Sequence, residues 1–145
     1  METIAHGTIS EVICIGFARG DLFLEGIRDA IVTHNIVNGV IISGFGTFST
    51  TRMHFTTRAG LPPHDEFVKL PDRALELVSL HGMIVNGAPH IHMTVGDMER
   101  TWAGHLEDGC VVLYLAEVAI GRLTGMQMER TEREYGIKNL TRAEQ

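Results

Sequence analysis

The sequence predicts an α+β fold: one compact domain with a mainly antiparallel or mixed sheet of about seven strands and one main helix. Two observations predict it. The 16 glycines and 4 prolines divide the 145 residues into short segments rich in β-branched side chains, which favours many strands. One segment alone has the three- and four-residue apolar spacing of an amphipathic helix. We expect residues 1–145 to form a single domain, with a core at about 8–122 and a polar tail at about 130–145.

The chain is expected to begin with a strand followed by the helix. Residues 9–18 are rich in isoleucine and valine, which is typical of a strand. In the segment that follows, Asp21 is the expected N-cap of a helix whose apolar face includes Phe23, Ile27 and Ile31. That face ends before an asparagine- and glycine-containing stretch, where the helix should stop.

Strands are expected to form the rest of the core. Residues 40–48 are predicted to be an apolar strand, with residues 49–57 returning beside it as its hairpin partner. A proline-rich loop follows. The polar tail is predicted to be a short helix or frayed. Further strands are expected at residues 74–85, 89–95 and 110–120, with a short strand that leads into His105.

Composition and charge restrict the classes of partner. The net charge is −6, from 18 acidic and 12 basic residues, and the arginines are scattered rather than gathered in a stripe, so direct binding to nucleic acid is not favoured. No apolar stretch approaches the roughly 18 to 20 residues of a membrane span. The first residues lack the basic start and apolar stretch of a signal peptide, so a cytoplasmic location is expected. Cys14 and Cys110 lie in apolar runs and are expected to be buried, reduced thiols.

Three of the eight histidines have a spacing with chemical meaning. His90 and His92 flank Ile91, and in a strand residues two apart point to the same face with Cα atoms about 6.5 to 7 Å apart. Two imidazoles so placed can share one metal ion at bonds of ~2.0 to 2.1 Å. His105 follows a turn and a returning segment, which can bring it opposite this pair. Three neutral histidines with an open position are the ligand set of a catalytic zinc site, although imidazole also suits nickel, iron or copper.

Each of these residues also has an ordinary structural explanation. A His-x-His pair in a strand is often exposed or hydrogen-bonded without a metal. For the remaining histidines a structural role is favoured, except that His81 is a candidate ligand, ligand partner or proton carrier. Glu117 interrupts an apolar run and is either a general base or an outward-facing carboxylate. The four histidines assigned a structural role are His6, His34, His54 and His64.

Several segments together resemble one known family, the plant-and-prokaryote conserved (PPC) domain, in order and spacing over roughly residues 8–122. They are Gly20-Asp21, the Gly-rich stretch from Gly39 to Gly46, Glu76 to Gly82, Pro89-His-Ile-His92 and Gly104-His105-Leu106. The usual family pattern has Gly-Gly-His where this chain has Ala103-Gly104-His105, a departure that should leave the ligand undisturbed.

The resemblance implies a compact α+β domain that assembles as a homotrimer, with His90, His92 and His105 as the metal ligands. The architecture is also similar to that of acetolactate decarboxylase, a zinc enzyme. Plant relatives join the domain to AT-hooks, which bind the minor groove through an Arg-Gly-Arg core. This chain has only Arg19-Gly20-Asp21, so DNA is a partner by family label alone.

Three functions therefore remain open from the sequence. The first is a metal-binding, trimeric module that acts through partners. The second is a zinc-dependent hydrolase or decarboxylase-like lyase that acts on a small carbonyl compound bound at the metal, with Glu117 or His81 moving a proton. The third is a structural trimer whose histidines only pack. Membrane partners are not expected.

Overall fold

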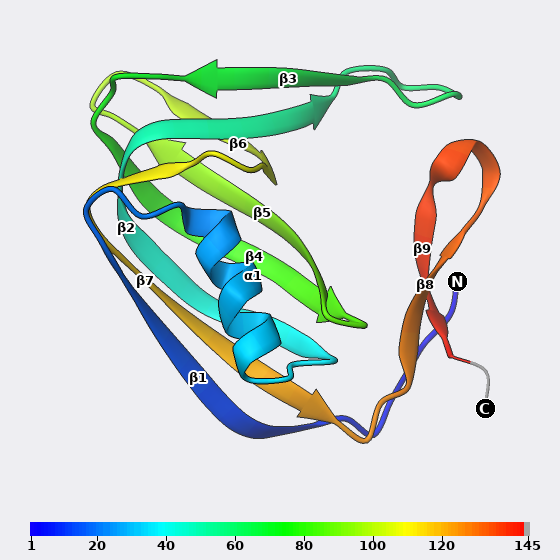
Figure 1. Ribbon diagram of the computed structural model, residues 1–145. Helices are drawn as coiled ribbons and strands as arrows, with labels where there is room; N and C mark the ends of the chain where they lie inside the picture. Colours follow the sequence, from blue (N-terminus) through cyan, green and yellow to red (C-terminus); the bar gives the residue numbers. More distant parts are fainter. Residues whose placement is uncertain (144–145) are drawn as a thin grey trace.

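A seven-stranded antiparallel sheet forms the body of the protein (Figure 1). The computed structural model describes residues 1–143. The predicted fold class, a sheet of about seven strands with one helix, is confirmed. The elements in chain order are β1 (Thr8–Ala18), α1 (Phe23–Thr33), β2 (Gly39–Thr56), β3 (Asp65–Leu70), β4 (Leu75–Val85), β5 (Ala88–Gly96), β6 (Thr101–Leu106), β7 (Val111–Thr124), β8 (Met128–Glu132), a 3-10 turn (Glu134–Gly136) and β9 (Lys138–Arg142).

The long strand β2 organises the sheet. The strands lie in the order β1-β7-β2-β4-β5-β6, and β3 also pairs with β2. The first part of β2 lies between β7 and β4, whereas its last residues pair with β3 and β6. Gly46 is one point of irregular register, with a φ of +147°. A Cβ at that position would lie 2.5 Å from the Cα of Ala116, so only glycine fits.

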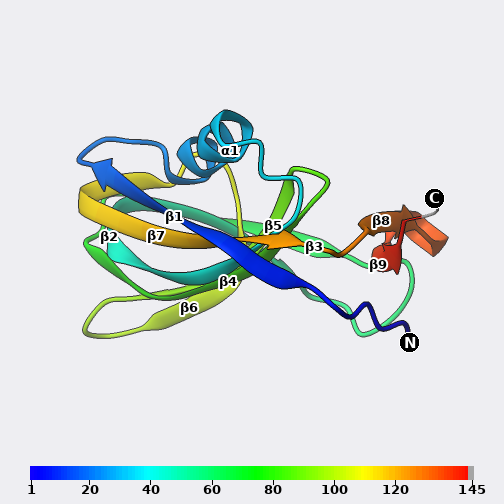
Figure 2. The same ribbon diagram turned by 90° about the horizontal axis from the view of Figure 1, so that it is seen from below.

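The helix covers one face of this sheet (Figure 2). Phe23 and Ile27 are fully buried, and the ring of Phe23 packs at 5.0 Å from that of Phe17 and 4.9 Å from that of Phe48. The strands alternate between this core and the opposite face. On the opposite face Phe45 and Val78 are 51% and 66% exposed, which leaves apolar side chains of the sheet uncovered.

Two expectations about individual elements are wrong, and one strand was missed. Asp21 does not cap α1: the N-cap is Leu22, and the Asp21 carboxylate accepts a hydrogen bond from the backbone N–H of Ala18 instead. No hairpin turn separates 40–48 from 49–57, because β2 runs through both ranges and changes its partners rather than its direction. Strand β3 was not expected from the sequence.

The polar tail is also different from the prediction, since most of it forms the β8–β9 hairpin, which stands apart from the main sheet (Figure 1). The guanidinium of Arg130 fixes this hairpin to the β4–β5 turn by donating to the carbonyls of Ala88 and Met83 at 2.9 and 3.1 Å. Because the contact is made by one residue far along the chain, local sequence pattern does not reveal it.

Both cysteines are free thiols. Cys110 is buried, as predicted, and burial raises the pKa of its thiol to about 12. Cys14 is exposed, so the expectation that it is buried is wrong: it points to the uncovered face of β1, opposite Ala119. Within residues 1–143, α1 falls short of the length and apolarity needed to cross a membrane.

Candidate metal centre

Four histidines form a row across four strands on the side of the sheet that faces away from the core. His81 of β4 is the cross-strand partner of His92 on β5, and His92 is the partner of His105 on β6. His105 is in turn paired with His54 of β2. Paired residues in antiparallel strands point to the same face, so the row follows directly from the register of β4, β5, β6 and β2.

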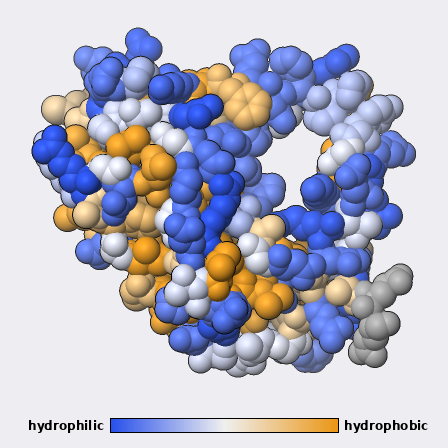
Figure 3. Space-filling view, viewed as in Figure 1, coloured by the Kyte–Doolittle hydropathy of each residue, from blue (hydrophilic) through white to orange (hydrophobic). Residues whose placement is uncertain are grey.

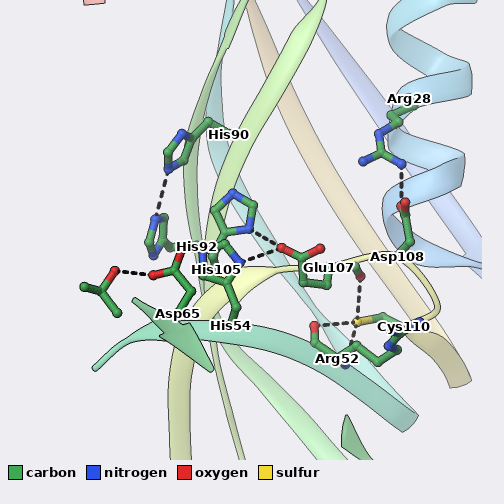
Figure 4. Close-up of polar contacts among 11 residues, drawn as sticks. Arg28, Arg52, His54, Asp65, His90, His92, His105, Glu107, Asp108 and Cys110 are labelled. Carbon is green, nitrogen blue, oxygen red and sulfur yellow. Dashed lines mark hydrogen bonds and ion pairs between the residues drawn. The ribbon is translucent and has the colours of Figure 1, made fainter. Parts of the chain in front are cut away.

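His90 and His92 are neighbours along β5 because of its alternation. Ile91 and Met93 are buried in the core, which turns the two histidines to the opposite face. The Nε2 atoms of His90 and His92 are 3.2 Å apart, and the two rings are nearly parallel, with centroids at 5.3 Å (Figure 4). The predicted convergence of these two imidazoles is therefore present in the structure.

His105 completes a group of three rings. Its centroid lies 4.8 Å from that of His90 and 5.3 Å from that of His92. The Nδ1 atom of His105 is 2.9 Å from Oε1 of Glu107, so its other nitrogen, Nε2, is left for a different partner. Figure 4 shows the three rings gathered at this point, with Glu107 on the far side of His105.

The spacing of the His90 and His92 nitrogens suits a transition metal. Two ligands of a tetrahedral ion, each at ~2.05 Å, lie about 3.3 Å apart. The Nε2–Nε2 distance between His90 and His92 is 3.2 Å, close to that value. Neutral imidazoles are good ligands for zinc and its first-row neighbours, so the donor set present fits such an ion.

A second group shares His105. His54, His105 and Glu107 offer ligand atoms that lie within 4.8 Å of one another. Glu107 Oε1 is, however, only 2.7 Å from Nδ1 of His54 and 2.9 Å from Nδ1 of His105. These are lengths of charge-assisted hydrogen bonds, shorter than the roughly 3.3 Å between ligands on one ion. The His90–His92 nitrogen spacing of 3.2 Å is closer to that of two ligands on one ion.

The surroundings keep these histidines neutral. Partial burial lowers the pKa of His90 to about 4, helped by His105, Arg130, His92 and His54. Burial, with the neighbouring His105 and His54, likewise lowers the pKa of His92. The pKa of His105 is lowered by burial and by His54, while Glu107 acts in the opposite direction. Neutral rings carry the free lone pairs that metal binding requires.

The two candidate proton carriers lie in different places. His81 is exposed and adjoins His92 in the row. Glu117 lies on β7, which β2 and β4 separate from β5, and its partners are Gly16 and Phe45. It lines a hollow of about 160 Å³ on the uncovered apolar face. Within the chain the structure does not bring Glu117 to the histidines, because its strand belongs to the other half of the sheet.

Sequence reasoning missed two residues of the cluster, His54 and Glu107. His54 was assigned a structural role, yet its ring stacks on that of His105 with centroids 4.4 Å apart. A signal for Glu107 was present: it stands two residues after His105, the same spacing that identifies the His90 and His92 pair. His54 gave no local signal, since it joins the row only because the end of β2 pairs with β6.

Two glycines allow the strands to approach closely beside the row. A Cβ at Gly82 would lie 2.4 Å from the carbonyl oxygen of His90. A Cβ at Gly104 would lie 2.8 Å from the carbonyl oxygen of His54. Both positions therefore exclude larger residues next to a histidine of the cluster.

Comparison with known proteins places the chain in a family. The model of the Plants and Prokaryotes Conserved (PCC) domain, the family also abbreviated PPC, matches residues 4–124. The chain belongs to the PPC domain family. A bifunctional protein GlmU from Synechococcus sp. is 30% identical over 83 residues, a match that spans 57% of this chain and only 12% of that relative.

Solved structures show the PPC fold over nearly the whole chain. A PPC protein from Pyrococcus horikoshii has a TM-score of 0.81 at 23% identity, with 100% of both chains covered. A metal-containing protein from Archaeoglobus fulgidus has a TM-score of 0.79 at 18% identity, covering 97% of this chain and 99% of that one. A candidate DNA-binding protein from Bacteroides thetaiotaomicron has a TM-score of 0.75 at 17% identity, and the alignment covers 97% of this chain and 98% of that one.

The expected likeness to acetolactate decarboxylase is present but weaker. A Staphylococcus aureus protein described as similar to that enzyme has a TM-score of 0.51 at 15% identity. The alignment covers 77% of this chain and 52% of the other. The PPC domain thus shares part of its architecture with that protein, and the likeness concerns the fold alone.

A cavity reaches the PPC histidine cluster from one side. It has a volume of about 730 Å³ and lies between the β8–β9 hairpin, the loop before β3 and the β4–β5 turn. His90 is in its wall, together with Arg130 and Lys138 from the hairpin and Asp65 from β3. In the space-filling view an opening is visible between the hairpin and the body of the molecule (Figure 3).

The lowered histidine pKa values predict an acid-sensitive fold in the metal-free protein. Below about pH 6.5 an unfolded chain takes up protons on its histidines. The folded chain resists this at His90 until pH falls to about 4. The free energy of unfolding should therefore be unaffected by these groups above pH 6.5 and should decrease as pH falls from 6.5 to 4.

Urea unfolding at a series of pH values measures this effect, with a His90→Gln/His92→Gln variant as the control. The variant should lose less stability than the wild type over this range. An identical pH dependence in both proteins would show that these two histidines are not held neutral by the fold.

Proposed function

We propose that this PPC domain binds a divalent transition metal, zinc in the first instance, through His90, His92 and His105, and that it acts as a homotrimer. The observation that carries the proposal is the meeting of three neutral imidazoles on one face, with the Nε2 atoms of His90 and His92 at 3.2 Å. The metal-containing A. fulgidus protein of the same fold supports it.

The three histidines would leave a zinc ion with an open coordination position. A bound ion of this kind supplies Lewis acidity and lowers the pKa of a water molecule. The side chains of the domain hold and orient it: the three rings provide the lone pairs, and Glu107 fixes the orientation of His105.

Trimer formation is supported by the uncovered face of the sheet. Val12, Phe45, Val78 and Leu115 are each about half exposed or more, and they lie on neighbouring strands away from α1. Isolated apolar side chains on a surface are ordinary, but several together on one sheet face favour burial against another protein surface. A second copy of the chain is the occupant that the family resemblance implies.

DNA is a weaker candidate partner. The candidate DNA-binding protein from B. thetaiotaomicron has the same fold, yet this chain carries a net charge of −6. Phosphate contacts supply most of the affinity in non-specific DNA binding, and an acidic protein without a basic stripe supplies few of them. A cytoplasmic location remains part of the proposal.

A second candidate function is a zinc-dependent hydrolase or lyase that acts on a small carbonyl compound. The cavity favours it, because a volume of about 730 Å³ with His90 in the wall is of the size that holds small-molecule ligands. His81, next to His92 in the row, is the proposed proton carrier in this function. Glu117, the other candidate proton carrier, lies away from the cluster within one chain.

Metal content tests the main proposal. Untagged wild-type protein, supplied with zinc and then dialysed, should contain close to one metal per chain when measured by plasma mass spectrometry. Because two of the three ligands are removed, a His90→Ala/His92→Ala variant should contain almost none. A His34→Ala variant, altered at the C-cap of α1, should retain the metal. A metal-free wild type, or equal metal in all three proteins, would refute the site.

The trimer predicts a mass in solution of about three times the chain mass of 16.0 kDa. Light scattering after size-exclusion chromatography measures it. A Phe45→Glu variant should have a lower mass, because a charge would be buried in the apolar interface. A wild type that is monomeric at all concentrations would contradict this part of the proposal.

A further inference from the structure

We propose that Glu107 is the positioning residue of the metal site: one carboxylate oxygen, shared by His54 and His105, fixes His105 with its Nε2 atom free for the metal. This inference rests on the proposed metal site and assigns it a set of supporting side chains. Glu107 itself does not bind the metal in this arrangement, and neither does His54.

The geometry of the shared oxygen is the first observation. Oε1 of Glu107 lies 2.7 Å from Nδ1 of His54 and 2.9 Å from Nδ1 of His105. The same oxygen serves both rings, which stack with centroids 4.4 Å apart and an interplanar angle of 23° (Figure 4). The two histidines are thus held side by side by a single acceptor.

The chemistry of a carboxylate then determines which ring nitrogen of each histidine carries the hydrogen. An ionised carboxylate only accepts hydrogen bonds, so each Nδ1 that contacts it must carry a hydrogen and donate it. A neutral imidazole with its hydrogen on Nδ1 has its lone pair on Nε2. His105 is therefore fixed in the form in which Nε2 is the ligand atom, the nitrogen left for the group formed with His90 and His92.

Glu107 is itself held in place by the backbone around it. Its N–H donates to the carbonyl of Arg52 at 3.1 Å, which continues the pairing of β6 with β2 past the last residue of the strand. The thiol of Cys110 donates to its carbonyl oxygen at 3.4 Å. The side chain is 28% exposed, and those of His54 and His105 are each 22% exposed, so solvent competes only partly for these hydrogen bonds.

The charge of Glu107 has a second consequence for a bound ion. Three neutral imidazoles leave the full charge of a divalent cation uncompensated. Among the described residues, Glu107 is the carboxylate in direct contact with one of the three rings. Asp65 stands further out, with its carboxylate 4.0 Å from Nε2 of His54 and hydrogen-bonded to the hydroxyl of Thr56. A carboxylate behind a ligating histidine commonly contributes about 10- to 100-fold to metal affinity.

His54 has a supporting role in this arrangement. By stacking on His105 and donating to Glu107, it keeps the carboxylate from turning away from His105. Its own Nε2 has the carboxylate of Asp65 as its neighbour, at 4.0 Å. His54 and Glu107 thus both support the ligating histidine without binding the metal themselves.

The experiment combines a spectroscopic and a thermodynamic measurement on the full chain. Ring 15N chemical shifts of the metal-free protein at pH 7.5 report which nitrogen of His105 carries the hydrogen. The wild type should show the Nδ1–H form alone, and Glu107→Gln and Glu107→Ala should each show a mixture. Competition with a chromophoric chelator should give zinc binding that is about 10- to 100-fold weaker in both variants.

Glu66→Gln is the matched control, because it removes the same charge from an exposed position of the neighbouring strand β3. It should bind zinc like the wild type. Equal zinc affinity and an unchanged His105 spectrum in the Glu107 variants would overturn the inference while leaving the metal site intact. A loss of zinc as complete as in His105→Gln would also overturn it, since Glu107 would then be a ligand. If the wild type binds no zinc, the proposed function itself fails.

Discussion

The pairing register of β2, β4, β5 and β6 sets both the core and the histidine cluster. His92 lies opposite His81 on one side and His105 on the other, and His105 lies opposite His54. The same register buries Ile91 and Met93 in the core. A slip of one residue in the pairing of β5 would exchange its two faces. The imidazoles of His90 and His92 would then enter the core, and Ile91 and Met93 would face water. Packing of the core and assembly of the histidine cluster are therefore set by one choice of pairing.

Gathering the histidines has an energetic cost that a metal ion can offset. The rings lie close enough that each opposes protonation of its neighbours, and partial burial adds to this effect. The fold thus keeps neutral imidazoles side by side before any ligand arrives. An ion that binds only the folded state would stabilise it in proportion to its affinity and concentration.

The sequence predicts the half of this site that follows strand periodicity. The spacing of His90 and His92 places both on one face, and the turn before His105 suggests its return to the same face. The rest of the site depends on how strand β2 pairs, which the sequence does not reveal. Its end turns from β4 to β6, and this non-local pairing alone brings His54 into the row. Glu107 is intermediate: its spacing from His105 was informative, but its partner on β2 was not visible in the sequence.

The fold shows the same division between local and non-local information. The apolar periodicity of α1 and the β-rich segments predict one helix on a sheet of about seven strands, as found. The β8–β9 hairpin was not predicted, because its place depends on Arg130 reaching the carbonyls of Ala88 and Met83. Glu117 was considered for a role at the metal because an acid in an apolar run is unusual. Only the strand order shows that β2 and β4 lie between β7 and β5.

Anomalous diffraction from crystals grown with zinc, with data on both sides of the zinc absorption edge, would locate a metal bound by the three histidines. We expect one strong anomalous peak per chain, within bonding distance, about 2.0 to 2.1 Å, of nitrogen atoms of His90, His92 and His105. Glu107 should remain outside that distance and in contact with His54 and His105. A peak between His54, His105 and Glu107, or no peak at the cluster at all, would contradict it.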